Sequence, residues 1–461
     1  MQVSKNALLR LLLLLLAATM FVALSCDDEE DGGGTDQTPG ATSDATSEDG
    51  DSGLSDIPED TTGVTDTQIL LGTHMPLTSE AALYGQQIVP GMQAYFDFIN
   101  ETEGGVNGRQ IKLLVEDDGY SPPRTNEVVR KLVEQDGVFA IVGGLGTAQH
   151  SAVFEYLADA KVPDLFMATG ATLFTDPITR TAFGFNPNYI QEGNGIGKYI
   201  AENYPEAKVG VIRQNDDFGA DGLAGIRQAI EGSTVEIVSE QTYEAANPPD
   251  LTVQVQRLQN DGADLVVVYS LPRQAASVIK VAREQLSWDA PLIFSGVVAD
   301  PTTIALAGGA ANADGAITTA YLRPLNQADD PAIIEHQEIM AEYQPDKAVS
   351  NLSLFGQSVA EMVVETLKAA GQDLNRRSVI AAAESIKGFT CSVCLAPINL
   401  SPTDHRPIEA FQFAEAEGDS WVVFGDLVSY ESTDGADSGD DAEPTDDAGS
   451  GDDTEPTETP E

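Results

Sequence analysis

Two turns rich in glycine and threonine carry the side chains in this chain that are best suited to binding chemistry. Residues 139–147 read FAIVGGLGT and residues 162–172 read VPDLFMATGAT, so each is a short apolar run that ends in glycine and threonine. Backbone N–H groups and threonine hydroxyls donate hydrogen bonds, which suits an anion such as a carboxylate. Tight turns and helix capping alone explain either turn equally well, but two of them together favour a small-ligand cleft.

The elements that position these turns form a strand–helix–strand unit. Apolar residues recur at helical spacing through residues 148–161, between the two runs. The pattern predicts two parallel, buried strands joined by a helix, and ligands bind beyond the carboxyl ends of such strands. Thr147 is placed to cap the helix, whose free N–H groups and positive dipole end favour an anion.

Sequence motifs for catalysis and metal binding are missing from the chain. Gly144-x-Gly146 is followed by Gln149 where a dinucleotide-binding turn needs Gly or Ala, and neither a phosphate-binding Gly-Lys-Ser/Thr loop nor a Gly-x-Ser-x-Gly elbow is present. A loop starting at Asp217 resembles a calcium loop, but Gln228 stands where its last ligand should be Glu. The four histidines lack metal-ligand spacing. We therefore expect no catalytic residue, no metal and no cofactor.

Two cysteines stand close together as Cys391-Ser-Val-Cys394. In a cytosolic thioredoxin-like protein this spacing forms a redox site. Here it lies between a helix and a strand, far from the first strand–helix–strand unit. We expect a small structural disulfide, with a redox site or a zinc site as the alternatives.

The chain is strongly acidic. Its 461 residues include 74 Asp and Glu against 24 Lys and Arg, which gives a net charge of −50. This charge argues against nucleic acid as a partner, and a solvated acidic surface is its simplest explanation. Residues 27–66 and 431–461 lack Lys and Arg and contain almost no large apolar residue. Both segments, a tether and a tail, should be disordered because they cannot bury enough surface to offset the entropy of ordering.

The N-terminus predicts export. The apolar run 11–24 follows basic residues and is too short for a permanent transmembrane helix. It ends in Ala23-Leu-Ser-Cys26, which resembles a bacterial lipoprotein signal, although Leu is usual where Ala23 stands. Residues 1–26 would then be a signal peptide, Cys26 would carry the lipid, and the protein would sit at the outer face of the cytoplasmic membrane. A plain secretory signal is the alternative.

Between residues 67 and 430, apolar runs of strand type alternate with amphipathic helical patterns. Besides the two runs above, strands are expected at residues 69–72, 111–115, 183–185, 209–212, 235–239, 265–269, 292–295 and 317–321. Helices are expected at residues 84–100, 123–134, 148–161, 193–204, 221–230, 251–259, 273–285, 331–343, 354–370 and 377–387. The alternation is typical of an α/β fold with parallel sheets. Roughly ten strands exceed one usual sheet, so we expect two lobes with a cleft between them.

Residues 67–430 resemble the periplasmic solute-binding proteins of the leucine/isoleucine/valine-binding family, the extracytoplasmic receptors of ABC importers. The segments that match in order and spacing are residues 69–78, 84–85, 104–108, 116–118, 142–147, 162–163, 168–171, 214–219, 262–265 and 425–426. The resemblance implies the type I periplasmic binding fold, in which two Rossmann-like lobes with parallel central sheets, joined by three crossovers, close on the ligand.

The resemblance also implies where the chain passes between the lobes. We expect crossovers near Asn186, Tyr321 and Asn399. Lobe 1 would then comprise about residues 67–186 plus 322–398, and lobe 2 would comprise residues 187–321 plus 399–430.

Ligand contacts follow from the same resemblance. Thr147 matches a hydroxyl-bearing position that binds the ligand's carboxylate. Tyr84 matches an aromatic residue over the ligand, Phe218 matches a tyrosine of the far lobe, and Leu271 falls where a second far-lobe aromatic is frequent. Core packing is the alternative role for Tyr84 and Phe218. A second turn supplies backbone groups and another hydroxyl, from Thr169 or Thr172; it comprises Ala168, Thr169, Gly170, Ala171 and Thr172.

The family's acidic partner for an amino acid's ammonium group falls near Val298, which is not acidic. Asp300 lies close by but requires a shift in the alignment. An unpaired buried ammonium group is costly. An aliphatic or aromatic acid without an amine therefore fits these residues at least as well as a branched-chain amino acid.

The resemblance implies a non-enzymatic receptor that captures a small carboxylate-bearing solute and hands it to ABC permease subunits. The N-terminal signal adds a lipid anchor. Ligand would shift an open–closed equilibrium, because only the closed form contacts it from both lobes. The alternatives are a ligand-sensing domain for a signalling partner and a hydrolase that uses acids in the cleft.

Overall fold

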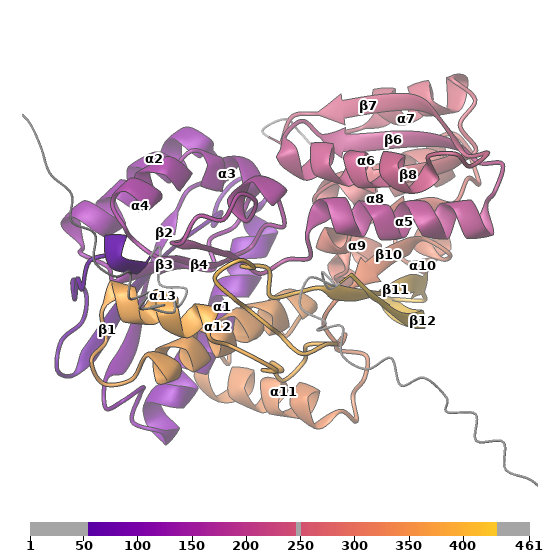
Figure 1. Ribbon diagram of the computed structural model, residues 1–461. Helices are drawn as coiled ribbons and strands as arrows, with labels where there is room; N and C mark the ends of the chain where they lie inside the picture. Colours follow the sequence, from indigo (N-terminus) through magenta and orange to yellow (C-terminus); the bar gives the residue numbers. More distant parts are fainter. Residues whose placement is uncertain (1–53, 246–249, 431–461) are drawn as a thin grey trace, which may run out of the picture. The chain divides into compact units, whose positions relative to one another are not determined.

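The computed structural model describes residues 54–245 and 250–430, which form two sheets flanked by helices (Figure 1). The first sheet is fully parallel, with the strand order β2-β1-β3-β4-β5. The second sheet has the order β12-β11-β10-β9-β8-β6-β7, and only its β10–β11 and β11–β12 pairs are antiparallel. Two α/β lobes with mostly parallel sheets confirm the predicted fold class.

The strands alternate with helices along most of the chain. The strands are β1 (Gln68–Met75), β2 (Gln110–Asp117), β3 (Ala140–Val142), β4 (Asp164–Met167), β5 (Ala182–Gly184), β6 (Lys208–Gln214), β7 (Glu236–Tyr243), β8 (Leu265–Tyr269), β9 (Leu292–Phe294), β10 (Ile317–Ala320), β11 (Ala410–Glu417) and β12 (Ser420–Ser429). The helices are α1 (Ala82–Thr102), α2 (Pro122–Arg130), α3 (Thr147–Ser151), α4 (Phe154–Asp159), α5 (Tyr189–Asn203), α6 (Asp217–Ile230), α7 (Thr252–Asn260), α8 (Pro272–Lys280), α9 (Pro301–Leu306), α10 (Ala310–Ala313), α11 (Pro331–Tyr343), α12 (Asn351–Ala370) and α13 (Arg376–Glu384). Five short helical turns complete these elements, at Leu54–Asp56, Lys131–Gln135, Thr172–Phe174, Val281–Gln285 and Gly296–Val298.

The helix expected at residues 148–161 is wrong as a single element. The structure divides it into α3 and α4, with Ala152 and Val153 between them. The Ser151 hydroxyl donates to the carbonyl of Thr147, 3.0 Å away, and Val153, a β-branched residue that fits a helix poorly, adopts a non-helical conformation. The turn at Gly146 is therefore followed by only five helical residues, Thr147–Ser151.

The antiparallel hairpin β11–β12 was not among the expected strands. It extends the second sheet beyond β10, with Ile317 opposite Glu415. Residues 410–417 do alternate between buried and less buried positions in their second half, as a half-buried strand should. Their content of Ala, Gln and Glu, which are helix formers, obscures that signal.

Residues 54–66 are ordered, so the expectation of a disordered tether over residues 27–66 is wrong for this part. Ile57 is buried, and its carbonyl accepts a hydrogen bond from Arg377 on α13. Arg377 and its neighbour Arg376 also form ion pairs with Glu59 and Asp60, respectively. One apolar anchor, two cations far along the chain and backbone hydrogen bonds such as Leu70 N to the Gly63 carbonyl hold a segment whose own composition predicts disorder. The rest of the tether, the signal at 1–26 and the tail at 431–461 lie outside the described residues.

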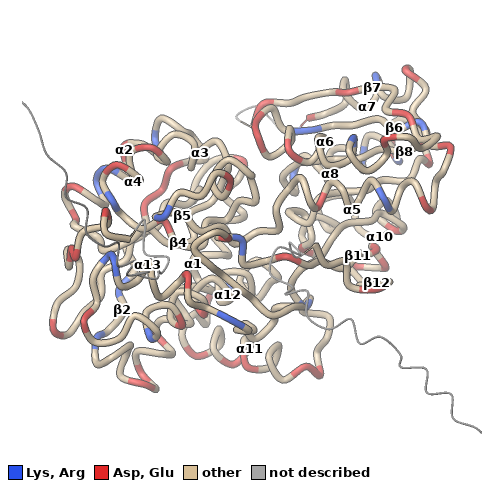
Figure 2. The backbone as a smooth tube through the Cα atoms, in the orientation of Figure 1, with Lys and Arg blue, Asp and Glu red and all other residues tan. Residues whose placement is uncertain are grey.

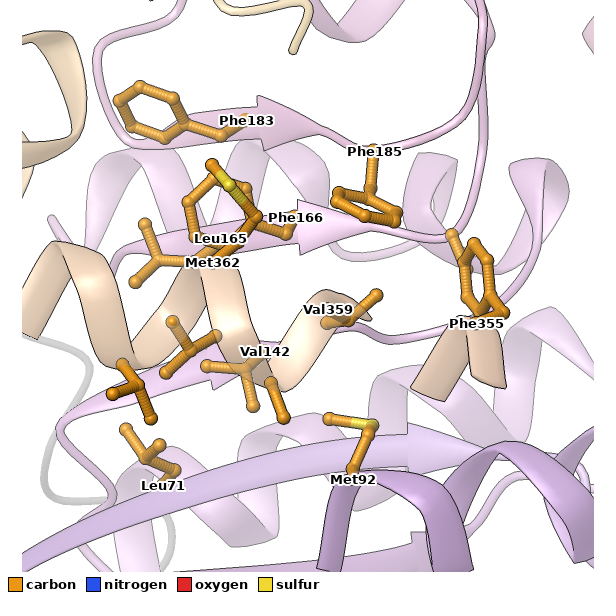
Figure 3. Packing of buried hydrophobic residues seen from close by; sticks show 14 of the residues in the cluster. Leu71, Met92, Val142, Leu165, Phe166, Phe183, Phe185, Phe355, Val359 and Met362 are labelled. Carbon is orange, nitrogen blue, oxygen red and sulfur yellow. The ribbon is translucent and has the colours of Figure 1, made fainter. Parts of the chain in front are cut away.

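A core of aromatic and aliphatic side chains joins α12 to the first sheet (Figure 3). Helix α12 contributes Phe355, Val359 and Met362 to this core. They pack beside side chains from the strands, from the residue after β5 and from α1, which are Leu71, Met92, Val142, Leu165, Phe166, Phe183 and Phe185. Helix α12 also packs closely on α1, where Gly91 lies against the backbone of Ser353 and leaves no room for a side chain. A late segment of the chain thus completes the first lobe.

Acidic residues occur throughout the loops and helices of both lobes and outnumber Lys and Arg (Figure 2). Among the described residues, no helix is both long enough and apolar enough to cross a membrane.

Cys391 and Cys394 form the predicted disulfide. Both are buried. Their turn contacts the segment that leaves β10, because Arg323 N donates to the Val393 carbonyl at 2.8 Å and Leu395 N donates to the Tyr321 carbonyl at 3.3 Å. The disulfide therefore closes a small loop beside a connection between the two sheets.

Replacing Cys391 and Cys394 together by serine should lower the free energy of unfolding by about 1–2 kcal/mol, because the disulfide closes only a short loop in the unfolded chain. The ranking of ligand affinities should stay the same, since neither cysteine lines the pocket described below. Denaturant unfolding of the double variant checks the first statement. Unchanged stability would contradict it.

Candidate functional site

A pocket lies between the two sheets, at the carboxyl ends of the parallel strands. It holds about 940 Å³ of empty space, including its open mouth. Its walls come from both lobes and from the segments that connect them. The turn at Leu145–Thr147 and the start of α12 contribute on one side, and the residues around Gly296 and the β11–β12 hairpin contribute on the other.

The pocket walls are mostly apolar. Arg323 is the only charged residue that lines the pocket in the described part of the chain. Its guanidinium group forms an ion pair with Asp330 at 2.8 Å, so its charge is already compensated. No Asp or Glu lines the pocket among the described residues.

Thr147 lines the pocket and contacts Thr169 behind that wall, as their positions after neighbouring strands predict. Their hydroxyl oxygens lie 2.7 Å apart, and both side chains are buried. The expectation that Thr147 caps a helix is wrong: the N-cap is Gly146, and Thr147 makes no capping hydrogen bond. Gly146 has a φ of 112°, and a Cβ there would overlap the Gln149 side chain. Only glycine fits this turn, which aims the Thr147 hydroxyl at Thr169.

The rest of the second turn is only partly at the pocket. Ala168 lines it, whereas Thr169, Gly170, Ala171 and Thr172 do not. Gly170 packs against the carbonyl of Pro187, and Ala171 lies in the core of the second lobe. The Thr172 hydroxyl accepts a hydrogen bond from Asn188 Nδ2 at 2.9 Å, outside the pocket. Of the two threonines that the sequence leaves open, Thr169 is the one beside Thr147.

The predicted aromatic and aliphatic contacts Tyr84, Phe218 and Leu271 all line the pocket. The Tyr84 hydroxyl donates to the carbonyl of Val297, 2.8 Å away in the other lobe. Burial raises the pKa of Tyr84 well above its usual value, so the phenol keeps its proton and remains a donor. The Phe218 ring lies 4.7 Å from that of Tyr189, which also lines the pocket.

Val298 does not line the pocket, although its neighbours Val297 and Ala299 do. Its side chain is fully buried in the core beneath α8 and α9. Asp300, the nearby acid, caps α9 through its Oδ1, which accepts a hydrogen bond from Thr302 N at 2.8 Å. Its Oδ2 has no hydrogen-bond partner among the described residues.

Several lining residues were not predicted from the sequence. They come from the second connecting segment, the start of α12, the β12 strand and two loops; they include Tyr120, Asn186, Tyr189, Tyr321, Leu322, Arg323, Pro324, Asn351, Leu352, Leu354, Phe355, Trp421 and Val423. Asn186 and Tyr321 each marked an expected crossover, and these crossovers were the signals that a pocket wall would follow. The others depend on how distant segments meet.

Glu192, near the start of α5, is a buried carboxyl group behind the pocket wall. Its Oε1 accepts a hydrogen bond from Gly296 N at 2.7 Å and another from the Thr319 hydroxyl. Burial raises its pKa to about 7, although these donors oppose the shift. The group thus holds the Gly296 turn in place and titrates near neutral pH.

Comparison with known proteins places this geometry in context. A family model described as "Periplasmic binding protein" matches residues 68–420. A Leu/Ile/Val-binding protein homolog 2 of Brucella abortus is 25% identical over 331 residues, which cover 71% of this chain and 84% of that protein. An amino acid binding protein of Pseudomonas aeruginosa is 27% identical over 269 residues, 58% of this chain and 71% of that protein.

Solved structures share the fold. A fatty acid ABC transporter substrate-binding protein from Thermomonospora curvata has a TM-score of 0.71 at 24% identity, covering 81% of this chain and 95% of its own. A branched chain amino acid ABC transporter protein from Thermus thermophilus, with bound valine, has a TM-score of 0.72 at 20% identity. The match covers 80% of this chain and 98% of that protein.

Proposed function

This chain belongs to the periplasmic binding protein family, and on that premise we propose that it is the extracytoplasmic receptor of an ABC importer. It captures a small carboxylate-bearing solute in the pocket between its lobes and delivers it to permease subunits, without chemistry of its own. Cys26 carries a lipid that anchors the protein at the outer face of the membrane.

The lobes that close on the solute follow the passage of the chain. Lobe 1 comprises about residues 67–186 plus 322–398, and lobe 2 comprises residues 187–321 plus 399–430. The chain leaves the first sheet after β5, packs α12 against that sheet after β10, and enters the second sheet again at β11. The hydrogen bond from Tyr84 to the Val297 carbonyl bridges the two lobes, as closure on a ligand requires.

The ligand is an aliphatic or aromatic acid that lacks an amine. One observation carries this choice: no acidic side chain lines the pocket in the described part of the chain, so a buried ammonium group would have no partner there. The hydroxyl of Thr147, which contacts that of Thr169, binds the carboxylate, and the walls around Phe218 and Leu271 bind the apolar body.

A branched-chain amino acid is the second candidate, and one observation favours it. Asp300 Oδ2 is buried without a hydrogen-bond partner among the described residues, directly next to the lining residue Ala299. A small movement of the turn at Val297–Ala299 would bring this oxygen to an ammonium group. Relatives named for leucine, isoleucine and valine agree with this alternative.

A thermal-shift screen of matched pairs tests the choice between the two. Leucine is compared with 4-methylpentanoate, and phenylalanine with 3-phenylpropanoate, so that each pair differs only by the amine. A ligand at one hundred times its Kd adds about 2.7 kcal/mol of stability. The amine-free acids should raise the melting temperature and the amino acids should not; the reverse result would establish the amino-acid alternative.

A further inference from the structure

A buried histidine lies directly behind the turn that faces the pocket. His150 is in α3, and its Nδ1 donates to the carbonyl of Gly146 at 2.9 Å. Its Nε2 lies 3.5 Å from Oδ2 of Asp164, at the start of β4. The side chains of His150 and Asp164 are 0% and 2% exposed. The imidazole therefore spans from the ligand turn to a carboxylate in the sheet.

The two neighbours of this ring are both acceptors. A neutral imidazole has only one N–H, so only the doubly protonated ring can serve the Gly146 carbonyl and the Asp164 carboxylate together. The 3.5 Å contact is an ion-pair distance, and neither an Asp164 oxygen nor His150 Nε2 has a hydrogen-bond partner among the described residues. A buried carboxylate without donors is costly unless a cation lies beside it. The contacts of both groups thus favour an ion pair.

The other groups that face His150 leave this pairing intact. The ring of His74, on β1, lies 4.7 Å away, and its Nδ1 donates to Asp118 Oδ2 at 2.8 Å. Asp118 also accepts hydrogen bonds from Tyr120 N and the Thr125 hydroxyl. Burial lowers the pKa of His150, but the charge of Asp164 and the Gly146 carbonyl outweigh burial and raise this pKa above its usual 6.5.

A bound carboxylate needs a compensating charge that the pocket walls do not provide. The Arg323 side chain is 35% exposed, so solvent screens its charge, and α3 has only five residues, so it contributes little helix dipole. His150 is 0% exposed and contacts the Gly146 carbonyl directly. Resting on the proposed function, we propose that His150 is the charge-compensating residue of the carboxylate site and that it couples ligand binding to the uptake of a proton.

The direction of the pH effect follows from linkage. Below the pKa of His150 the imidazolium is present before the ligand arrives, and affinity is highest. As the pH rises through that pKa, the charge is lost and affinity should fall by about three- to tenfold, which is the size expected for one charge several ångströms away. A simple carboxylic acid, with a pKa near 4 to 5, stays ionised throughout this range.

Calorimetric titration of the purified protein with 4-methylpentanoate and 3-phenylpropanoate tests the proposal. Affinity is measured from pH 6 to 8.5, in buffers of different ionisation enthalpy that reveal protons taken up on binding. The wild-type protein should take up a fraction of a proton and bind more weakly at high pH. His150→Asn keeps a donor for the Gly146 carbonyl but carries no charge, so its affinity should be lower and independent of this titration.

His405→Asn is the matched control. The His405 ring contacts a carbonyl, that of Ala182 at 2.8 Å, and a carboxylate, that of Glu384 at 3.3 Å, so it repeats the contacts of His150. It does not line the pocket, and its variant should keep the pH profile of the wild type. Titrations are repeated in the Glu192→Gln background, because Glu192 gains charge in the same pH range.

The outcomes separate this proposal from the proposed function. Acids that bind with flat affinity and no proton uptake overturn the role of His150 while the receptor function stands. The same holds if His150→Asn keeps the wild-type profile. If His150→Asn does not fold, Asp164→Asn is measured instead and should likewise lose proton uptake; retained uptake overturns the proposal. If neither acid binds the wild type, the proposed ligand class fails and the inference fails with it.

Discussion

The wild-type protein should lose about 3 kcal/mol of its free energy of unfolding as the pH rises from about 4.5 to about 7, and replacing Glu192 by glutamine should abolish this loss. The carboxyl group has its usual pKa of 4.5 in the unfolded chain and about 7 in the folded protein, where burial is the main cause of the shift. Between these two values the folded state keeps a proton that the unfolded state releases. The contribution of Glu192 to stability is therefore fully present below pH 4.5 and declines as the pH rises through 7.

Denaturant unfolding at pH 5, 6, 7 and 8 measures this effect. The difference in free energy of unfolding between Glu192→Gln and the wild type should grow in favour of the variant as the pH rises. Glu384→Gln is the control, because it removes an equally buried carboxyl group that instead pairs with Arg180 at 2.8 Å. That variant should be less stable than the wild type. Parallel pH profiles for Glu192→Gln and the wild type would contradict the prediction.

Replacing Thr147 by valine should weaken binding of an amine-free acid by about 2–3 kcal/mol, the value of a hydrogen bond to a charged group plus the cost of leaving Thr169 with one partner fewer. Valine has nearly the same shape as threonine, so the change isolates the hydroxyl. The Thr147 hydroxyl is buried against Thr169 at 2.7 Å and lines the pocket.

Thr172→Val provides the matched control for this substitution. Its hydroxyl accepts from Asn188 and lies away from the pocket lining, so the affinity should change little. Isothermal calorimetry of both variants and the wild type gives the comparison. Equal losses in the two variants, or none in Thr147→Val, would place the carboxylate elsewhere in the pocket.

The sequence predicts the fold well because its signals are local. Residues 265–269 are an unbroken apolar run and become β8, a fully buried strand. Residues 331–343 have the spacing of a helix and become α11. The failures arise from contacts between residues that are far apart in the sequence. Ile57 and two acids pack against distant arginines, an interaction that no local composition reveals.

The site is predicted only where it depends on strand ends. Thr147 and Thr169 follow neighbouring parallel strands, which necessarily bring them together. Val298 shows the limit of an alignment, since its two neighbours line the pocket while its own side chain enters the core. The pair of His150 and Asp164 joins a helix to the beginning of a strand. The separation of these residues in sequence gives no sign of this contact, which depends on tertiary packing.

One measurement addresses the central claim most directly: calorimetric titration of the purified protein with 4-methylpentanoate and with leucine, which share a carbon skeleton and differ by the ammonium group. We predict saturable binding of the acid at one site and leucine binding at least about tenfold weaker, because no acidic side chain lines the described pocket. Tighter binding of leucine would contradict this account and would identify Asp300, with its unpartnered Oδ2, as the first candidate for the ammonium site.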